Sequence, residues 1–386
     1  MKRVGVFLMA DPEGGGTFQY QLAVLEAVNA LPREKYNVFA VYENDLWMEY
    51  IKEYKVESIK LPSDYLSKVA ILGFQKFKVP TWLKRILISF CTPIVWRLSC
   101  DLLIYPHPSE WSSILRVPAL TTIYDLMHRY ETRFPEVFED GEYEMRETLY
   151  TNMCKYTRGV LVDSEVGKQH VIECYGLNEQ QIFVLPYIAP KYIWASKHKS
   201  DLLENHELPR KFLFYPAQFW MHKNHKNLLK AAAQVKQIFP DIHLVFVGAK
   251  KNGYENTIYL IDELNLQANT TILGYVSNDY MVELYKKARA LIMPTFLGPT
   301  NIPPLEAFEL GCPVATSNVY GIPKQVGDAA LLFNPESVDE IANCIVKLWN
   351  DDLVCNELSV RGKQKATEWG QLQFNRRLLQ IIENIC

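Results

Sequence analysis

The segment 293–316, MPTFLGPTNIPPLEAFELGCPVAT, combines a loop of small residues with a carboxylate a few positions further on. In the stretch Gly298 to Asn301 the backbone can come close to a ligand. Pro303 suits the first turn of a short helix and Gly311 the position just past its end. The amino end of that helix favours a phosphate, and Glu306 could accept hydrogen bonds from two ribose hydroxyls. A plain connecting loop with a solvated Glu306 is the alternative.

A second group of candidate residues lies in the stretch FWMHKNHKN (219–227), where Lys223 and Lys226 fall at an expected strand-to-helix junction. In an open α/β sheet ligands bind beyond the carboxyl ends of the strands, so this loop and the Gly298 loop can converge. A diphosphate would fit between these two loops, and Lys223 would compensate its negative charge as the nucleoside diphosphate leaves. The alternative is that both lysines are solvated residues at a helix start.

A metal site is the other chemistry that this stretch could support. His222 and His225 are three residues apart, but the sequence offers no obvious third ligand, so we predict no metal. The sequence also lacks the Asp-x-Asp motif that many metal-dependent transferases use to bind their metal ion.

Apolar runs of strand length, separated by helical stretches, recur along the whole chain and must position these loops. In the first half we expect strands at residues 4–10, 36–42, 56–61, 102–105, 120–124, 159–162 and 182–185. After a polar, charged stretch, the alternation restarts with strands at 211–215, 243–248, 270–274, 290–293, 313–316 and 330–333. Repeated β-α units predict the α/β class, with mainly parallel sheets covered by helices on both faces.

The length of 386 residues and a hydrophobic content of 48% predict two domains with substantial cores. We place an N-terminal Rossmann-like domain at 1–190, a linker at 191–209, a C-terminal Rossmann-like domain at 210–368 and a final helix at 369–386.

Composition narrows the class of protein further. A formal net charge of -3 argues against a general nucleic-acid binder. The eight cysteines form no C-x-x-C pair, and the N-terminus has neither the long apolar core nor the cleavage site of a signal peptide. These features predict reduced thiols and a cytoplasmic location. No uncharged apolar run is long enough to span a bilayer, so any membrane contact would be peripheral.

One segment has a composition typical of such peripheral contact. Residues 65–100 contain no acidic side chain, and six lysines and arginines alternate with phenylalanines, tryptophans and aliphatic residues. Basic side chains could meet anionic headgroups while the aromatics lie at the interface. The alternative is a core helix with a basic, solvated face.

Three motifs in the second half resemble those of the retaining glycosyltransferases of family 4, which have the GT-B architecture. The motifs are Ala217-Gln218 followed by Lys223-Asn224 and LLKA, then PPLEAFELGCPVATS, then GDAALLFNP. TTIYDLMHRYETRFPE and GVLVDSEVGK in the first half resemble the family more weakly. The resemblance implies two Rossmann-like domains facing across a cleft, with the sugar nucleotide held mainly by the second, the nucleotide-sugar domain, and the acceptor by the first, the acceptor domain. It also implies that the C-terminal helix crosses back to the first domain.

The sequence departs from this family pattern at four positions, one of which is Lys324, where an acidic residue is common. Gln218 stands where an arginine usually makes a second diphosphate contact, so Lys223 would carry most of the charge compensation. Gly298 stands where the first of two paired glutamates is usual, and Glu306 matches the second. The frequent His-Asp pair of the first domain is Tyr124-Asp125, with His128 three residues later.

The resemblance implies transfer of a sugar from a nucleoside diphosphate sugar to an acceptor hydroxyl, with retained configuration and without a cofactor. Lys223, Gln218 and the helix beginning near Pro303 would stabilise the leaving diphosphate. Glu306 would clamp the ribose. The other substrate-binding residues that we predict are Gly15, Gly16, Asn224, Gly298, Thr300 and Asn301.

Asp125 and His128 are the candidates for orienting the acceptor or relaying a proton. A structural role for both is the alternative, because an aspartate can simply end a strand and cap the next turn, and a lone histidine is commonly structural.

The basic and aromatic segment leads us to expect a glycan or lipid-linked acceptor in bacterial surface polysaccharide assembly, at the inner face of the membrane. Three other functions compete. A GT-B protein could serve as a non-catalytic binding subunit, or the same architecture could carry an epimerase or phosphorylase. An NAD-dependent oxidoreductase would need G-x-G-x-x-G, but a motif starting at Gly14 would end at Gln19.

Overall fold

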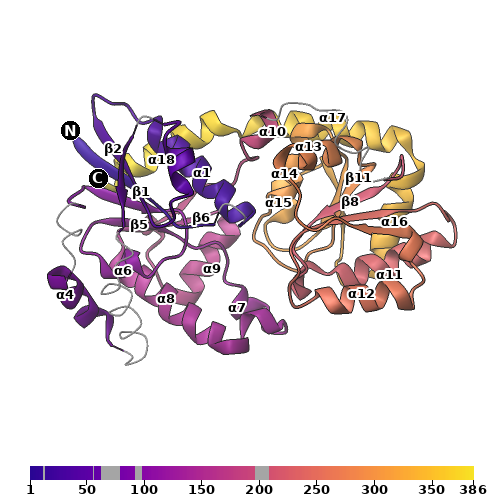
Figure 1. Ribbon diagram of the computed structural model, residues 1–386, viewed down its shortest axis with the longest axis horizontal. Helices are drawn as coiled ribbons and strands as arrows, with labels where there is room; N and C mark the ends of the chain where they lie inside the picture. Colours follow the sequence, from indigo (N-terminus) through magenta and orange to yellow (C-terminus); the bar gives the residue numbers. More distant parts are fainter. Residues whose placement is uncertain (12–13, 55, 62–78, 92–97, 196–207) are drawn as a thin grey trace. The chain divides into compact units, whose positions relative to one another are not determined.

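A computed structural model describes the chain from residue 1 to 386 except residues 12–13, 55, 62–78, 92–97 and 196–207 (Figure 1). The described residues form two compact units. Unit 1 comprises Met1–Leu126, Tyr143–Ile188 and Gln371–Cys386, and unit 2 comprises Met127–Glu142 and Ala189–Gly370. Residues 127–142, which lie in the first half of the sequence, therefore group with unit 2.

Unit 1 is built on a parallel sheet of seven strands in the order β3-β2-β1-β4-β5-β6-β7. Its strands are β1 (Lys2–Leu8), β2 (Tyr36–Tyr42), β3 (Glu57–Lys60), β4 (Leu102–Tyr105), β5 (Ala119–Thr122), β6 (Gly159–Val162) and β7 (Ile182–Val184). Its helices are α1 (Gly16–Asn29), α2 (Trp47–Ile51), α4 (Thr81–Cys91), α6 (Trp111–Ile114), α8 (Glu142–Tyr156), α9 (Glu165–Tyr175) and α18 (Gln371–Ile385), with the short η3 (Glu179–Gln181). The strand order reverses between β1 and β4, as in a doubly wound fold.

Unit 2 contains a parallel sheet of six strands in the order β10-β9-β8-β11-β12-β13. The strands are β8 (Leu213–Pro216), β9 (Leu244–Val247), β10 (Thr270–Ile272), β11 (Ala290–Met293), β12 (Val314–Ser317) and β13 (Ala330–Phe333). The order reverses between β8 and β11, which pair directly. This switch point is where an open α/β sheet binds ligands, at the carboxyl ends of the strands.

Helices and short 3-10 turns connect the strands of unit 2. They are α7 (Met127–Tyr130), η1 (Pro135–Val137), η2 (Glu139–Gly141), α10 (Tyr192–Ala195), η5 (Met221–Lys223), α11 (His225–Lys236), α12 (Tyr254–Glu263), η6 (Gln267–Asn269), α13 (Asn278–Lys287), α14 (Pro303–Leu310), α15 (Ile322–Val326), α16 (Val338–Asn350) and α17 (Asp352–Glu368). Helix α10 lies in the expected linker, most of which is outside the described residues.

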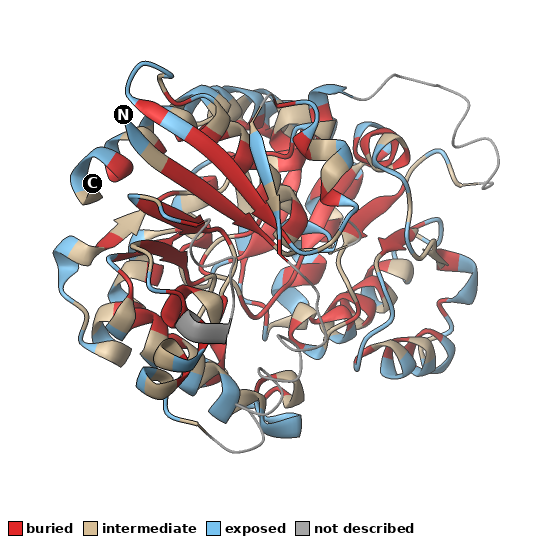
Figure 2. Ribbon diagram, turned by 60° about the vertical axis from the view of Figure 1, so that its left-hand side comes forward, coloured by how far each residue is buried: buried red, intermediate tan, exposed pale blue. Residues whose placement is uncertain are grey.

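The strands are apolar because most of them are covered on both faces, and Figure 2 shows them mainly buried in both sheets. The helices bury one stripe each. In α16, Ile341, Ile345 and Leu348 are buried at helical spacing, and the Ser337 hydroxyl caps the first turn by accepting from Glu340 N at 3.2 Å. The two doubly wound parallel sheets predicted from the sequence are thus confirmed.

The C-terminal helix returns to the first unit, as the sequence predicts. Helices α17 and α18 are separated by Trp369 and Gly370, and α18 packs along α1. The Arg377 side chain also donates to the Val184 carbonyl at 3.2 Å, next to the last strand of the first sheet.

Much of the basic and aromatic segment 65–100 lies outside the described residues, but helix α4 belongs to the described part. Lys84 is buried and pairs with Glu110, and the Arg85 guanidinium lies 4.9 Å from the Tyr156 ring centroid. Trp82 is 57% exposed. Helix α4 therefore directs two of its cations toward the protein, and no helix among the described residues is long and apolar enough to cross a membrane.

Candidate functional site

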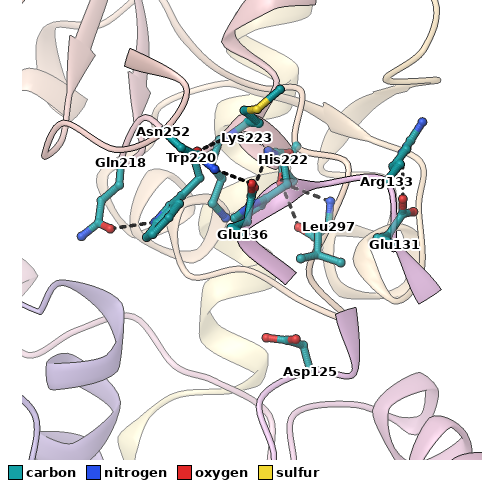
Figure 3. A network of polar contacts seen from close by, with 12 residues as sticks. Asp125, Glu131, Arg133, Glu136, Gln218, Trp220, His222, Lys223, Asn252 and Leu297 are labelled. Atoms are coloured by element: carbon teal, nitrogen blue, oxygen red, sulfur yellow. Dashed lines mark hydrogen bonds and ion pairs between the residues drawn. The ribbon is translucent and has the colours of Figure 1, made fainter. Parts of the chain in front are cut away.

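The loop after β8, residues 217–224, is the Lys223 loop, and its backbone is fixed by side chains from other parts of unit 2. Met221 N donates to the Asn252 side-chain oxygen at 3.1 Å, and His222 N donates to Glu136 at 2.9 Å. The Tyr215 hydroxyl donates to the Lys223 carbonyl at 2.9 Å. The Lys223 side chain therefore starts from a backbone held on both sides (Figure 3).

Asn224 lies at the junction between this loop and helix α11 and caps the helix. Its φ of 60° is in the left-handed region, which asparagine tolerates better than most residues. Its side-chain oxygen accepts from Asn227 N at 3.3 Å, and its amide donates at 2.9 Å to the carbonyls of Pro294 and Pro335. A residue that we predicted to bind the donor thus caps the helix and ties it to two neighbouring loops.

The loop after β11, residues 294–302, is the Gly298 loop, and hydrogen bonds join it to the Lys223 loop. The His222 carbonyl accepts from Phe296 N at 2.9 Å and from the Thr295 hydroxyl at 3.4 Å. Since β8 and β11 are parallel neighbours, both loops leave the sheet at the same edge, at the switch point. The structure thus places the two sequence-predicted loops together.

Gly298 is a glycine for a steric reason. Its φ is 122°, which side chains rarely adopt, and a β-carbon there would lie 2.6 Å from the Asn301 side-chain nitrogen. Asn301 therefore fills the space next to position 298. A glutamate at this position, the usual residue in the resembled family, could not be accommodated unless Asn301 moved.

Asn301 presents a buried hydrogen-bond donor that has no partner among the described residues. Its side chain is 8% exposed, and Nδ2 makes no hydrogen bond. Its backbone is held on both sides by Gln325, which accepts from Asn301 N at 3.0 Å and donates to Asn301 O at 2.6 Å. Leaving a buried amide unsatisfied is costly, so the arrangement favours a ligand acceptor at this point. Thr300, the neighbouring predicted residue, is half-buried.

Glu306 lies in the first turn of α14, which begins at Pro303 and is followed by Gly311 in the left-handed conformation, with φ 70°. Its carboxylate is buried and accepts from the hydroxyls of Tyr285 at 2.5 Å and Tyr192 at 2.7 Å. A carboxylate has about four acceptor positions, so two bonds leave capacity for ribose hydroxyls.

Burial raises the pKa of the Glu306 carboxyl, and the two tyrosine hydroxyls partly offset that rise. Burial also raises the pKa values of Tyr192 and Tyr285 well above the ordinary value, so both stay protonated and act as donors. The carboxylate is thus oriented by two fixed donors before any ligand binds.

Gln218 occupies the start of the Lys223 loop. Its side-chain oxygen accepts from the Trp220 indole at 3.0 Å, which leaves its amide group as a donor (Figure 3). The end of β9 lies so close to this backbone that a β-carbon on Gly248 would come within 2.7 Å of Gln218 N. Gln218 can therefore offer one neutral donor toward a diphosphate, as expected from its chemistry.

The predicted residues of unit 1 lie at the carboxyl edge of the first sheet. Gly15, with φ 61°, caps α1 without a side-chain hydrogen bond, and Gly16 is the first residue of the helix. Asp125, shortly after β5, forms an ion pair of 3.1 Å with Arg146. Gly15 and Gly16 are exposed, whereas Asp125 is already paired.

His128 does not share a unit with Asp125. It lies in α7 with no exposed surface, among residues that group with unit 2. His107, which the sequence analysis did not single out, follows β4 beside Tyr124, with ring centroids 5.7 Å apart. Burial lowers its pKa to about 4, and its Nδ1 has no partner among the described residues.

The two histidines considered for a metal are engaged elsewhere. The His222 ring contacts Glu136 at 2.6 Å, and the His225 ring stacks on Phe219 with centroids 4.5 Å apart. Among the described residues no group of three histidine, cysteine or acidic side chains could hold a metal ion.

Four residues of this site were missed by sequence reasoning: Glu136, Tyr192, Tyr285 and Gln325. Glu136 and Tyr192 contact partners that are far away in the sequence. Tyr285 and Gln325 lie nearer to their partners, 21 residues from Glu306 and 24 residues from Asn301. The only local signal was the Phe-Pro-Glu triplet at 134–136 within a motif that resembles the family.

Comparisons with known proteins bear on the family and the fold. Residues 196–369 match the family model described as Glycosyl transferases group 1. The chain is 29% identical over 282 residues to the O-antigen chain mannosyltransferase B of Escherichia coli, covering 69% of this chain and 70% of that protein. It is 25% identical over 329 residues to the O-antigen chain mannosyltransferase RfbU of Salmonella typhimurium, covering 84% of each.

Two further matches bear on length and fold. The serotype-specific mannosyltransferase WbdA of Escherichia coli is 21% identical over 240 residues, but the match spans only 29% of that longer protein. The crystal structure of Anabaena Alr3699/HepE in complex with UDP-glucose superimposes with a TM-score of 0.74 at 14% identity, covering 99% of this chain and all of the other. This likeness shows a shared fold.

Proposed function

We propose that the chain, whose residues 196–369 match the family model of glycosyl transferases group 1, is a nucleotide-sugar glycosyltransferase with the GT-B fold that transfers mannose to a surface-polysaccharide acceptor. The sugar identity rests on the O-antigen mannosyltransferases of Escherichia coli and Salmonella typhimurium that it resembles. The proposed reaction breaks the bond between the anomeric carbon and the diphosphate and forms a bond to an acceptor hydroxyl, with configuration retained.

The junction of the Lys223 and Gly298 loops is the observation that carries the proposal. It combines a lysine on a fixed backbone, the buried donor of Asn301 and the amino end of α14 at one edge of the sheet. Together they offer a cation, an amide donor and a favourable dipole where a leaving diphosphate would develop charge.

The roles that we propose follow from these positions. Lys223 and Gln218 compensate the diphosphate, while Asn301 and Thr300 contact the donor sugar or its phosphate. Glu306, oriented by Tyr192 and Tyr285, binds the ribose hydroxyls. The backbone of Gly298, with Asn301 beside it, takes the place of the usual glutamate.

On the acceptor side, we propose that Gly15 and Gly16 let the backbone approach the substrates and that Asp125 orients the acceptor. His128 is a weaker candidate because its side chain is fully buried. We further propose a lipid-linked glycan acceptor and a cytoplasmic enzyme that contacts the inner face of an anionic membrane through residues 65–100. The exposed Trp82 is the described feature that supports membrane contact.

A panel of nucleoside diphosphates and their sugars, screened by thermal shift, tests the donor assignment. A ligand at a hundred times its dissociation constant adds about 2.7 kcal/mol of stability. Radiolabelled sugar transfer to a lipid-linked oligosaccharide then tests the reaction. The absence of a shift with every nucleoside diphosphate would contradict the proposal.

A non-catalytic binding subunit is the alternative that the departures at Gly298 and Gln218 motivate. It predicts nucleotide binding without turnover. Slow hydrolysis of the sugar nucleotide in the absence of acceptor, lost in Lys223→Ala, distinguishes the enzyme from such a subunit.

A further inference from the structure

Residues Met127–Glu142, the clasp segment, come after β5 in sequence but pack on the loops of unit 2. The Phe134 ring stacks on Phe296 with centroids 5.4 Å apart, and the Arg133 guanidinium lies over Phe296 at 4.5 Å. Glu131 accepts from the Tyr320 hydroxyl at 2.7 Å. Met127, Phe134, Val137, Phe296 and Leu297 form a small buried cluster. The clasp segment thus lies against the residues that immediately precede Gly298.

Glu136 is the residue of the clasp segment that contacts the Lys223 loop. One carboxylate oxygen accepts from His222 N at 2.9 Å and contacts the His222 ring nitrogen Nδ1 at 2.6 Å. The other oxygen accepts from the Asn252 amide at 2.7 Å. The side chain is only 6% exposed, so these bonds are largely shielded from water.

The chemistry of the contact fixes the state of both partners. Burial alone would raise the pKa of Glu136, but the hydrogen bonds from His222 and Asn252 lower it to about 2. The carboxylate is then ionised and can only accept, so His222 Nδ1 must carry a proton. Charge-assisted bonds of this kind are shorter and stronger than neutral ones.

Asn252 extends the same restraint by one residue. Its amide donates to Glu136, and its oxygen accepts from Met221 N at 3.1 Å. Met221 and His222, the two residues before Lys223, are therefore bound by the Asn252 amide and the Glu136 carboxylate, which are also hydrogen-bonded to each other. Figure 3 shows Glu136 at the centre of these contacts, with His222 on one side and Asn252 on the other.

We propose that Glu136 is a positioning residue for sugar transfer: from the clasp segment it holds His222 and thereby sets the position of the Lys223 ammonium against the diphosphate. The inference rests on the proposed donor site. Glu136 itself touches neither donor nor acceptor. An electrostatic contact stabilises a leaving group only when its geometry is set in advance, and a misplacement of about 1 Å can reduce a rate about 100-fold.

The test compares Glu136→Ala, Glu136→Gln and the wild type in the full chain, using sugar-nucleotide turnover and binding of the nucleoside diphosphate. Glutamine keeps an oxygen that accepts from His222, whereas alanine removes it. We expect Glu136→Ala to lower kcat about 10-fold to 100-fold and Glu136→Gln to recover most of that loss. Equal activity of Glu136→Ala and wild type would overturn the proposal.

A double-mutant cycle with Lys223→Ala separates positioning from general destabilisation. If Glu136 acts through Lys223, adding Glu136→Ala to Lys223→Ala should change kcat less than about twofold. Multiplicative losses would show that Glu136 acts independently of Lys223 and would overturn the proposal.

Glu131→Ala is the matched control, because it removes a carboxylate of the same segment that bonds Tyr320 instead of the Lys223 loop. We expect it to lower Tm without the loss in kcat. An equal kcat loss in Glu131→Ala would point to detachment of the whole clasp segment and count against a specific role for Glu136. If Glu136→Ala is poorly folded, Asn252→Ala tests the same restraint from its other side.

These measurements separate the two proposals. If the wild type neither binds nor turns over any sugar nucleotide, the proposed function fails. If the wild type is active and the cycle is multiplicative, only the positioning role fails.

Discussion

The Lys223 and Gly298 loops of unit 2 differ from the glycines at the start of α1 in unit 1 in how firmly their backbones are held by side chains. In unit 2, the backbones of His222, Lys223 and Asn301 each accept or donate bonds to side chains from elsewhere in the unit. In unit 1, α1 begins at a glycine cap without a side-chain bond. For the proposed donor site this difference implies an arrangement that is ordered in advance, whereas the proposed acceptor side leaves more freedom at the start of α1.

The largest expected effect comes from Lys223→Ala. Removing the cation that we propose to face the leaving diphosphate should lower kcat about 100-fold to 1,000-fold. Turnover of the sugar nucleotide measures it, with the exposed Lys226→Ala as the matched control. A loss below about tenfold would show that Lys223, although its loop is well ordered, does not stabilise the leaving diphosphate.

Gly298→Ala should have the second-largest effect on sugar transfer. The added β-carbon lies 2.6 Å from the Asn301 nitrogen, so Asn301 must move, and we expect kcat/KM for the donor to fall about 100-fold. Gly327→Ala is the control, because it also has a positive φ, 57°, but nothing lies within 4 Å. Similar losses in both variants would attribute the effect to backbone strain.

Glu306→Gln should change nucleotide affinity and protein stability in opposite directions. We expect nucleotide affinity to fall about tenfold, since a bond to a charged group contributes about 1.5 kcal/mol or more, and Tm at pH 7 to rise. The native pKa of Glu306 is raised above 4.5, so the folded state holds the proton more tightly. The free energy of unfolding therefore falls as pH rises from about 4.5 through the native pKa and stays lower above it.

The pH profile of Tm checks the sign of this effect. Glu306→Gln should lack that decrease, whereas Glu309→Gln, on the next turn of α14, should leave nucleotide affinity unchanged. A lower Tm for Glu306→Gln at pH 7 would contradict the expectation.

Asp125→Asn should have the smallest effect on the donor side. The ion pair with Arg146 is partly exposed, so its loss should cost about 1 kcal/mol of stability or less. Nucleoside diphosphate affinity, measured by calorimetry, should stay within about twofold of the wild type, while transfer to the acceptor falls if Asp125 orients it. A loss of nucleotide affinity as large as that of Lys223→Ala would remove the contrast between the two regions.

The sequence predicted the architecture because strand patterns and helix signals are local. The runs at 213–216 and 290–293 are apolar, Gly311 ends α14, and the spacing between Lys223 and Glu306 matches the family motifs. Parallel pairing of β8 with β11 then brings the two loops together without further information.

The supporting contacts could not be predicted because no local pattern encodes them. Glu136 lies 86 residues before His222, and Tyr192 lies 114 residues before Glu306 in a stretch whose polarity indicated a linker. Asn301 shows the same limit. The sequence predicted it as a donor contact, but only the three-dimensional structure shows that its side chain excludes a glutamate at position 298.

The division of the chain has a consequence for recombination between relatives. The backbone passes from one unit to the other four times, after Leu126, Glu142, Ile188 and Gly370. A chimera joined only at the middle of the chain would therefore pair the Lys223 loop of one parent with the clasp segment of the other. Glu136 and His222 would then come from different parents, and the proposed positioning role predicts that an active hybrid must inherit residues 127–142 together with the second half.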